Sequence, residues 1–214
     1  MAIRRGKDLR RKRGSLPEQK RILIYCEGRV TERRYFSALI KKYRVPGVRL
    51  GSEHGEPLRL VTAAIDHKRR APYSDKDQHQ EYDEVWCVLD VEAPKPQPSL
   101  DRALELARRH GVNCAVSNPC FELWLILHLA DHSGYLTTNK ACELLEKHGA
   151  CCGYRRDGKD FRPDPLLQHY DVARRRARRL AENHEAGKRL TDRNPFTSVW
   201  LLADRLIAQN GARP

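Results

Sequence analysis

The segment Val85-Trp86-Cys87-Val88-Leu89-Asp90-Val91-Glu92 decides how this chain is expected to fold. A short run of apolar and β-branched residues is typical of a strand buried on both faces of a parallel sheet. Carboxylates are rare in buried strands unless they are paired or bind metal, so Asp90 and Glu92 mark the end of this strand. Glu27 follows a second such run, Ile22-Leu23-Ile24-Tyr25-Cys26. We therefore expect these acids together at one sheet edge, where open α/β sheets bind ligands.

Helical patterns alternate with short apolar runs around these two strands. The helix after Glu27 is predicted to begin at Thr31, a good N-cap, with Glu32 in its first turn. Further capping residues are expected at Ser99 and Asn118, and Pro119 suits a first turn. Strands are predicted at 21–26, 48–50, 84–90 and 112–117, and helices at 31–44, from 57, 99–110 and 121–129. This order predicts an α/β fold with a mainly parallel four-stranded sheet flanked by helices.

The chain is expected to have three regions. Residues 1–20 are basic, with little apolar periodicity, and are predicted to form a flexible arm. Residues 21–135 would form the α/β domain. Residues 136–214 show only helical patterns, so helical additions packed on that domain are expected there. These helices are predicted at 139–148, 166–186 and 195–209, the last with Asn194 as its cap and Pro195 in its first turn.

The charge balance favours a polyanionic partner. The 214 residues include 41 Lys and Arg against 28 Asp and Glu, a formal net charge of +13, and such a balance is typical of nucleic-acid binding. Basic residues concentrate in the arm and in a late helix, although a charge run can equally be a solubilising surface. The nucleic-acid contacts we predict are Arg10, Arg11, Arg13, Arg174, Arg175 and Arg178.

The expected cellular location rests on two sequence features, the length of the apolar runs and the composition of the N-terminus. No apolar run approaches the ~18 residues of a membrane span, and the basic N-terminus has no apolar signal-peptide core. We therefore expect a cytoplasmic protein with no membrane partner. The seven cysteines are an odd number, and a reducing cytosol disfavours disulfides.

Three further candidate sites also have a structural interpretation. His148, Cys151 and Cys152, with Cys142 upstream, suggest zinc, but adjacent cysteines depart from the spacing of structural zinc ligands. Cys120 is a candidate nucleophile without an evident activating partner, so packing is favoured. His128, in an apolar helix, is likewise expected to be a packed side chain.

The acidic residues have a specific chemical interpretation. In an extended segment, residues i and i+2 point the same way, so Asp90 and Glu92 would face one site, with Glu27 beside them. Oxygen ligands suit Mg²⁺ or Mn²⁺, and three carboxylates around such an ion can orient a phosphodiester for hydrolysis. The alternative is that these residues merely end the strand.

Four motifs resemble those of RloB-like proteins, and they extend over nearly the whole chain. Residues 24–36 read Ile-Tyr-Cys-Glu-Gly-Arg-Val-Thr-Glu-Arg-Arg-Tyr-Phe, and residues 86–90 read Trp-Cys-Val-Leu-Asp. Residues 117–128 read Ser-Asn-Pro-Cys-Phe-Glu-Leu-Trp-Leu-Ile-Leu-His, and residues 194–197 read Asn-Pro-Phe-Thr. The third of these is quite specific to the family, whereas Cys-Glu-Gly is shared with relatives.

The resemblance implies a Toprim-like domain in a protein of bacterial restriction loci and phage defence, including abortive infection. Toprim domains have a Glu after their first strand and Asp-x-Asp after a later one. Glu27 matches that Glu and Asp90 the first Asp, while Glu92 stands in place of the second Asp. This departure places the carboxylate one methylene further out, yet Glu remains a competent oxygen ligand.

The roles implied by the resemblance are specific. Glu27 would be a general acid–base or metal ligand, Asp90 and Glu92 would bind Mg²⁺ (or Mn²⁺), and Glu122 is a further candidate that a helix dipole would also explain. The leading hypothesis is a Mg²⁺-dependent nuclease acting on DNA or RNA in phage defence. The alternatives are a non-catalytic nucleic-acid-binding or partner module with a degenerate carboxylate site and, more weakly, nucleotidyl transfer. A defence-system partner protein and a homo-oligomer both remain open.

Overall fold

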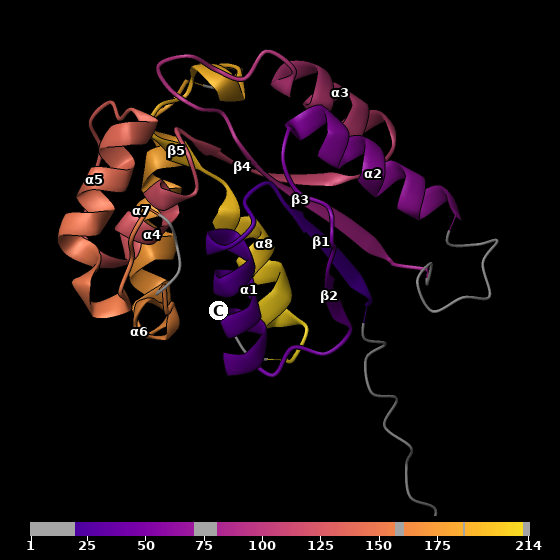
Figure 1. Cartoon of the computed structure of the whole chain (residues 1–214), viewed down its shortest axis with the longest axis horizontal. Coiled ribbons are helices and arrows are strands. Elements are labelled where there is room, and N and C mark those ends of the chain that lie inside the picture. The colour runs from indigo at the N-terminus through magenta and orange to yellow at the C-terminus, as the bar shows by residue number, and fades with distance from the viewer. Residues whose placement is uncertain (1–19, 71–80, 157–160, 186, 212–214) are drawn as a thin grey trace, which may run out of the picture.

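The computed structural model describes residues 20–70, 81–156, 161–185 and 187–211. A five-stranded sheet lies at its centre, in the order β2-β1-β3-β4-β5 (Figure 1). The strands are β1 (Ile22–Cys26), β2 (Val48–Leu50), β3 (Glu84–Asp90), β4 (Asn113–Asn118) and β5 (Phe196–Thr197). All neighbouring pairs are parallel except β4 and β5. The α/β class and the mainly parallel sheet are therefore confirmed.

The fifth strand corrects the prediction for the C-terminal region. Phe196 and Thr197 were expected inside a helix capped by Asn194, but they pair antiparallel with Asn118 and Ser117. The helix begins only at Val199. A strand of two residues is too short to show the alternation that identifies strands in a sequence, so only its pairing with β4 reveals it.

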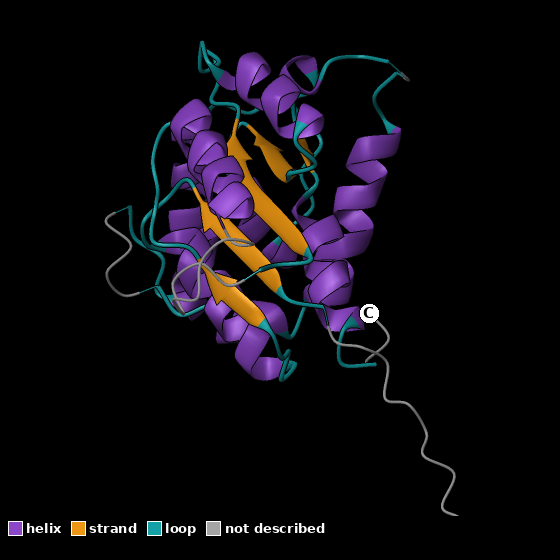
Figure 2. Cartoon of the chain, turned by 90° about the vertical axis from the view of Figure 1, so that its right-hand side faces the viewer, coloured by secondary structure: helices purple, strands orange, loops and turns teal. Residues whose placement is uncertain are grey.

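Two layers of helices cover the sheet. Helices α2 (Pro57–Arg70) and α3 (Leu100–Arg109) lie on one face, and α1 (Thr31–Lys42) and α8 (Val199–Ala208) lie on the other (Figures 1 and 2). The division follows the period of two in a strand. In β1, for example, Leu23 and Tyr25 join the core under α2 and α3, whereas Ile22, Ile24 and Cys26 join the core under α1 and α8.

The remaining helices gather at one end of the sheet, on the left in Figure 1. They are α4 (Glu122–Leu129), α5 (Thr138–His148), α6 (Asp164–Leu167) and α7 (Tyr170–Glu182), with the 3₁₀ turn η3 (Gly149–Cys152). A second 3₁₀ turn, η4 (Leu190–Asp192), lies beside β4, and its Leu190 packs against the core under α2 and α3. The single helix expected at 166–186 is thus two helices, interrupted at Gln168 and His169. The apolar helix α4 is surrounded by its neighbours, and its Trp124 is fully buried.

The predicted caps Thr31 and Asn118 are wrong, whereas Ser99 is at the N-cap position of α3 but makes no side-chain cap hydrogen bond. Thr31 is the first residue of α1, and neither α1 nor α3 has a side-chain cap hydrogen bond. The Ser99 hydroxyl contacts the Glu56 carboxylate instead. Asn118 ends β4, and α4 starts only at Glu122. A tertiary contact engages the Ser99 side chain, and strand pairing engages Asn118.

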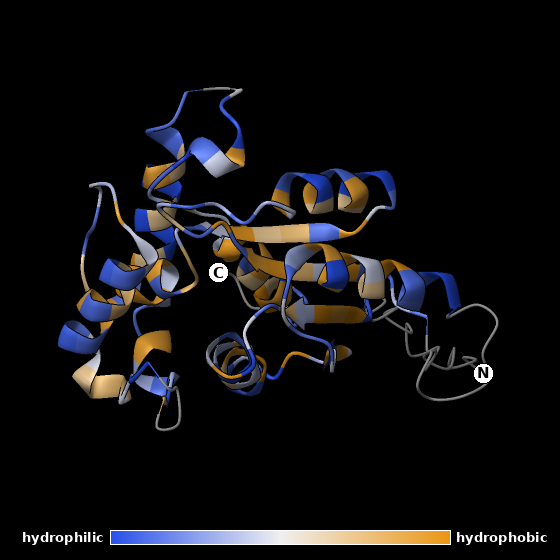
Figure 3. Cartoon of the chain, turned by 45° about the horizontal axis from the view of Figure 1, so that its top comes forward, coloured by the Kyte–Doolittle hydropathy of each residue, from blue (hydrophilic) through white to orange (hydrophobic). Residues whose placement is uncertain are grey.

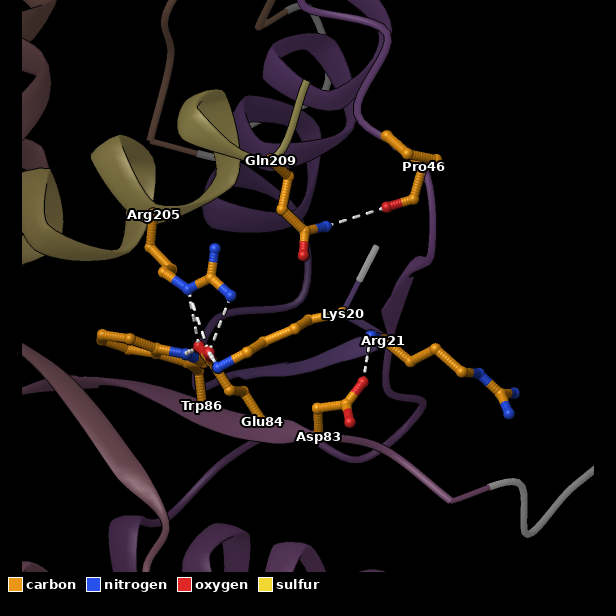
Figure 4. Close-up of polar contacts among 8 residues, drawn as sticks. All are labelled: Lys20, Arg21, Pro46, Asp83, Glu84, Trp86, Arg205 and Gln209. Atoms are coloured by element: carbon orange, nitrogen blue, oxygen red, sulfur yellow. Dashed lines mark hydrogen bonds and ion pairs between the residues drawn. The ribbon is translucent and has the colours of Figure 1, made fainter. Parts of the chain in front are cut away.

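Polar contacts connect α8 to the start of β3, at the end of the sheet opposite to Glu27 and Asp90. Arg205 Nε and Nη2 donate to the Glu84 carboxylate at 2.8–3.1 Å, and Lys20 Nζ donates to it at 3.2 Å (Figure 4). Trp86 Nε1 also donates to Glu84. This pairing stabilises a carboxylate at the start of β3 that would otherwise be poorly solvated.

The hydropathy pattern agrees with this layering. The strands are apolar, while the outward faces of the helices are hydrophilic (Figure 3). Within the described part of the chain, none of the helices has the length and apolar character needed to cross a membrane.

Candidate active site

The ends of β1 and β3 bring Glu27 and Asp90 together. Glu27 follows β1, and its carboxylate accepts a hydrogen bond from the Asp90 main-chain N–H at 3.0 Å. Its other oxygen accepts a hydrogen bond from Gln97 Nε2 at 2.6 Å, and the same nitrogen donates to the Asp90 carbonyl at 3.0 Å. Glu27 is therefore held against the end of β3 by donors on both of its oxygens.

The proline-rich loop after β3 supports this arrangement. Ala93 N donates to Thr138 Oγ1 at 3.1 Å, and Thr138 N donates to the Ala93 carbonyl at 3.0 Å. Gln97 N donates to the Val91 carbonyl at 2.9 Å. The loop is thus bonded both to the sheet edge and to the start of α5, and this positions the Gln97 amide over Glu27.

The surroundings of Asp90 disfavour the charged form of its carboxylate. Its Oδ1 atom is buried, with no hydrogen-bond partner among the described residues. Burial raises the Asp90 pKa well above its ordinary value, and repulsion from Glu32 and Glu27 adds to that rise. A buried oxygen that lacks a donor is costly, so this atom is available to a cation.

Glu32 is a member of the site that the sequence analysis assigned only to a helix start. It is 5 % exposed, and its carboxylate accepts a hydrogen bond from Gly28 N at 2.8 Å. Burial raises its pKa to about 7, with repulsion from Glu122 and Glu27 contributing. Burial likewise raises the pKa of Glu27 to about 6, although its hydrogen bonds to Asp90 and Gln97 oppose the rise.

The residue at position 28 must be glycine for this contact. A Cβ at Gly28 would lie 2.1 Å from Glu32 Oε2, a distance that real Cβ atoms do not show. Glu32 lies in the first turn of α1, and Gly28 precedes that helix. The close approach therefore fixes the position of the first turn of α1 relative to the end of β1. A Cys-Glu-Gly stretch followed by an acidic first turn is the sequence signal that would have identified Glu32.

Glu122 and two cysteines form the wall opposite β1. Glu122 accepts a hydrogen bond from the Tyr154 hydroxyl at 2.8 Å. Cys120 is buried, and its thiol contacts Cys142 of α5, a contact that raises the Cys120 pKa and lowers that of Cys142. Both cysteines remain free thiols. Tyr154 had no predicted role, because no local pattern links it to Glu122.

Glu92 occupies the site with a backbone that the sequence analysis did not anticipate. The segment was expected to be extended, but β3 ends at Asp90 and Glu92 has a φ of 68°. Its N–H donates to the Pro119 carbonyl at 2.8 Å. The left-handed turn, rather than strand alternation, therefore places the Glu92 side chain.

These residues line one open pocket of about 630 Å³ at the carboxyl edge of the parallel strands. All four predicted catalytic residues lie in it, together with Glu32 of α1, Glu56 from the loop before α2, and the Gln97 amide. The acidic members are Glu27, Glu32, Glu56, Asp90, Glu92 and Glu122. Arg29 and Arg156 are the basic residues on its lining.

The donor chemistry of this pocket fits a hard divalent cation. Carboxylate oxygens are the ligands that Mg²⁺ and Mn²⁺ prefer, and Asp90 Oδ1 has no competing donor among the described residues. No three His, Cys, Asp or Glu side chains in the described ranges stand close enough together to hold an ion as they lie. Three of these side chains would therefore have to move closer together to hold an ion.

The structure separates the predicted basic contacts of α7 from this pocket. Arg10, Arg11 and Arg13 fall outside the described residues. Arg174 donates to Asp204 at 2.7 Å, and the Arg178 guanidinium lies 5.7 Å from the Trp200 ring centroid. Arg175 is exposed on α7. Among the described residues on the lining of the pocket, none belongs to α7.

His128 lies in the packed interior of the helical group. It is 2 % exposed, its Nδ1 is 2.9 Å from the Trp124 carbonyl, and its Nε2 is 3.2 Å from the Tyr35 hydroxyl. Burial lowers its pKa to about 3. The imidazole is neutral at physiological pH and links α4 to α1.

Comparison with known proteins gives one match. The sequence model of the family described as RloB-like protein matches residues 22–206. That range includes the whole sheet and every carboxylate of the pocket. No curated protein and no solved structure matches the chain. Because the match covers most of the chain, the protein belongs to the RloB-like protein family.

Proposed function

We propose that this protein is a cytoplasmic, Mg²⁺-dependent, Toprim-type nuclease that hydrolyses nucleic-acid phosphodiesters in bacterial phage defence. The observation that carries the proposal is the Asp90 carboxylate, buried without a donor for Oδ1 and surrounded by Glu27, Glu32 and Glu122. Such clustering of unneutralised acids is costly for folding and is typical of metal-dependent active sites. Membership of the RloB-like family supports the link with defence.

The side chains divide into two groups by chemistry. Asp90, Glu92 and Glu122 would hold the cation, which supplies charge neutralisation and lowers the pKa of a bound water. Glu27 and Glu32, whose pKa values are raised to about 6 and about 7, are suited to accept or return a proton near neutral pH. Gln97 keeps Glu27 in place through its 2.6 Å hydrogen bond.

The test combines metal binding with turnover. Calorimetric titration with MgCl₂ and MnCl₂ should show binding to the wild-type protein and none to Asp90→Ala. Labelled DNA and RNA should be cut by the wild-type protein and not by Glu27→Gln, while circular dichroism shows both variants folded. Cleavage that survives both substitutions would exclude this site as the catalytic centre.

One observation favours a second candidate, a nucleic-acid-binding or partner module with a degenerate carboxylate site. Both Glu27 oxygens are already occupied by Asp90 N and Gln97 Nε2, and no described group of three ligands is preassembled. This candidate predicts nucleic-acid binding without turnover, and without metal binding at any pH. The same titration and cleavage assays decide between the two.

A further inference from the structure

A basic groove runs along α1 from the mouth of the carboxylate pocket. It is a second hollow, of about 520 Å³, between α1 and residues 161–164. Among the described residues on its lining, five side chains are cationic and one, Asp164, is acidic. We call this hollow the basic groove. Its cationic residues are Arg29, Arg33, Arg34, Lys41 and Arg162.

The basic groove and the carboxylate pocket are continuous. Arg29 and Val30 line both hollows. Both residues belong to the turn that joins Glu27 to α1, so the route from the acids to the groove follows the chain itself. The groove then extends from Arg33 to Lys41, which are eight positions apart and so about 12 Å along the helix axis.

The positive charge in the groove is available to a ligand. Arg29, Lys41 and Arg162 are exposed, and within the described parts of the chain none of them forms an ion pair with a carboxylate. Arg33 donates to the Gly51 carbonyl, and Arg34 donates to the Phe161 carbonyl at 3.0 Å. A carbonyl partner orients a guanidinium without cancelling its charge, so Arg33 adds a positioned positive charge beside the three exposed cations.

We propose that the basic groove binds the sugar–phosphate backbone of a nucleic-acid strand and leads it into the carboxylate pocket. The inference deepens the proposed function and rests on it for the fate of the bound strand. Lys and Arg contacts to phosphate supply affinity without reading sequence. Cations that follow α1, together with Arg162 across the groove, suit one strand, and the buried Phe161 offers no exposed ring for base stacking. This surface differs from α7, which carries the predicted contacts Arg174, Arg175 and Arg178.

The test compares two triple variants that remove the same charge from exposed positions. The groove variant is Arg29→Ala, Lys41→Ala and Arg162→Ala, and the matched control is Arg102→Ala, Arg175→Ala and Arg178→Ala. Binding of fluorescein-labelled single-stranded DNA and RNA is followed by anisotropy in EDTA, so that it does not depend on metal or cleavage. Salt is varied between about 50 and 200 mM, because each phosphate contact contributes to the salt dependence.

The groove variant should bind at least about tenfold more weakly, and its slope of log affinity against log salt should be less negative by about 2. The control triple should bind as the wild-type protein does. Equal losses of nucleic-acid binding in both triple variants would overturn the proposal. Tighter binding of a polyglutamate peptide than of the labelled nucleic acids would also overturn it, and would assign the groove to an acidic protein segment. The single change Arg29→Glu should weaken binding in the same direction if the triple variant does not fold.

The two proposals fail in different ways. Loss of binding in the groove variant, with no cleavage by the wild-type protein, would retain the groove and overturn the nuclease. Cleavage by the groove variant at the wild-type KM would overturn the groove and retain the nuclease.

Discussion

The Glu27 carboxylate accepts a hydrogen bond from the main-chain N–H of Asp90 at 3.0 Å, so the acidic ends of two neighbouring strands are joined directly. This contact exists because β1 and β3 are adjacent and parallel, with Cys26 in register with Val88. It holds Glu27 against the Asp90 backbone even though the two carboxylates repel each other. Both oxygens of the Glu27 carboxylate therefore accept hydrogen bonds, whereas Asp90 Oδ1 has no hydrogen-bond partner among the described residues.

Substitution of Asp90 should stabilise the metal-free protein and abolish metal binding and cleavage. Asp90→Asn removes a buried charge that repels Glu32 and Glu27, so the metal-free protein should gain on the order of 1 kcal/mol in free energy of unfolding at pH 8. Mn²⁺ binding and cleavage should be lost. Urea unfolding in EDTA measures the gain, and the exposed Asp171→Asn serves as the control. A destabilised Asp90→Asn protein would contradict the electrostatic account.

Stability should fall as pH rises through the range in which Glu27 and Glu32 ionise. Their pKa values in the folded protein, about 6 and about 7, lie above the ordinary value of 4.5. Between pH 4.5 and 7 the folded protein therefore holds protons that the unfolded chain has released, and the free energy of unfolding decreases. Unfolding curves at several pH values should show this decrease.

Two changes should weaken that pH dependence. The double variant Glu27→Gln and Glu32→Gln removes the titrating groups, and saturating Mg²⁺ stabilises the folded state at high pH by mass action. The exposed Glu185→Gln variant should keep the wild-type profile. An unchanged profile in the double variant would show that other groups control the pH dependence.

Gly28→Ala should disturb the site through Glu32. The added Cβ would meet Glu32 Oε2 at 2.1 Å, so the carboxylate must leave the Gly28 amide, at a cost of about 1–3 kcal/mol. Cleavage should fall with it. Gly134→Ala is the matched control, because a Cβ there meets nothing within 4 Å. Thermal unfolding of the two variants should therefore differ, and equal melting temperatures would argue against the close contact.

Arg205→Ala should destabilise the fold without changing metal binding. Glu84 has a side chain that is 15 % exposed and would keep only Lys20 and Trp86 as donors, so a loss of about 1–3 kcal/mol is expected. The exposed pair of Arg59 and Glu53 offers a control, because Arg59→Ala should change stability little. A double-mutant cycle with Glu84→Gln measures the pair, and coupling near zero would refute its contribution.

Much of the fold was predictable from local pattern. The runs 22–26 and 84–90 are buried strands because apolar side chains facing both ways require cover on both faces. The same logic placed Glu27 and Asp90 at one edge, since parallel strands that are neighbours end together. These conclusions need only the order of apolar and polar residues, and that order is local in the chain.

The tertiary structure alone decided the features that depend on distant partners. Phe196 and Thr197 form a strand only because β4 offers them an edge, and Glu122 is oriented by Tyr154 from beyond the next helix. Gln97 reaches Glu27 across 70 positions of the chain. Such contacts leave no periodic trace in the sequence, because side-chain hydrogen bonds form wherever packing brings a donor and an acceptor together. The positions of strands are thus set by local hydrophobicity, whereas the polar contacts of the site are set by the packing of segments that lie far apart in the chain.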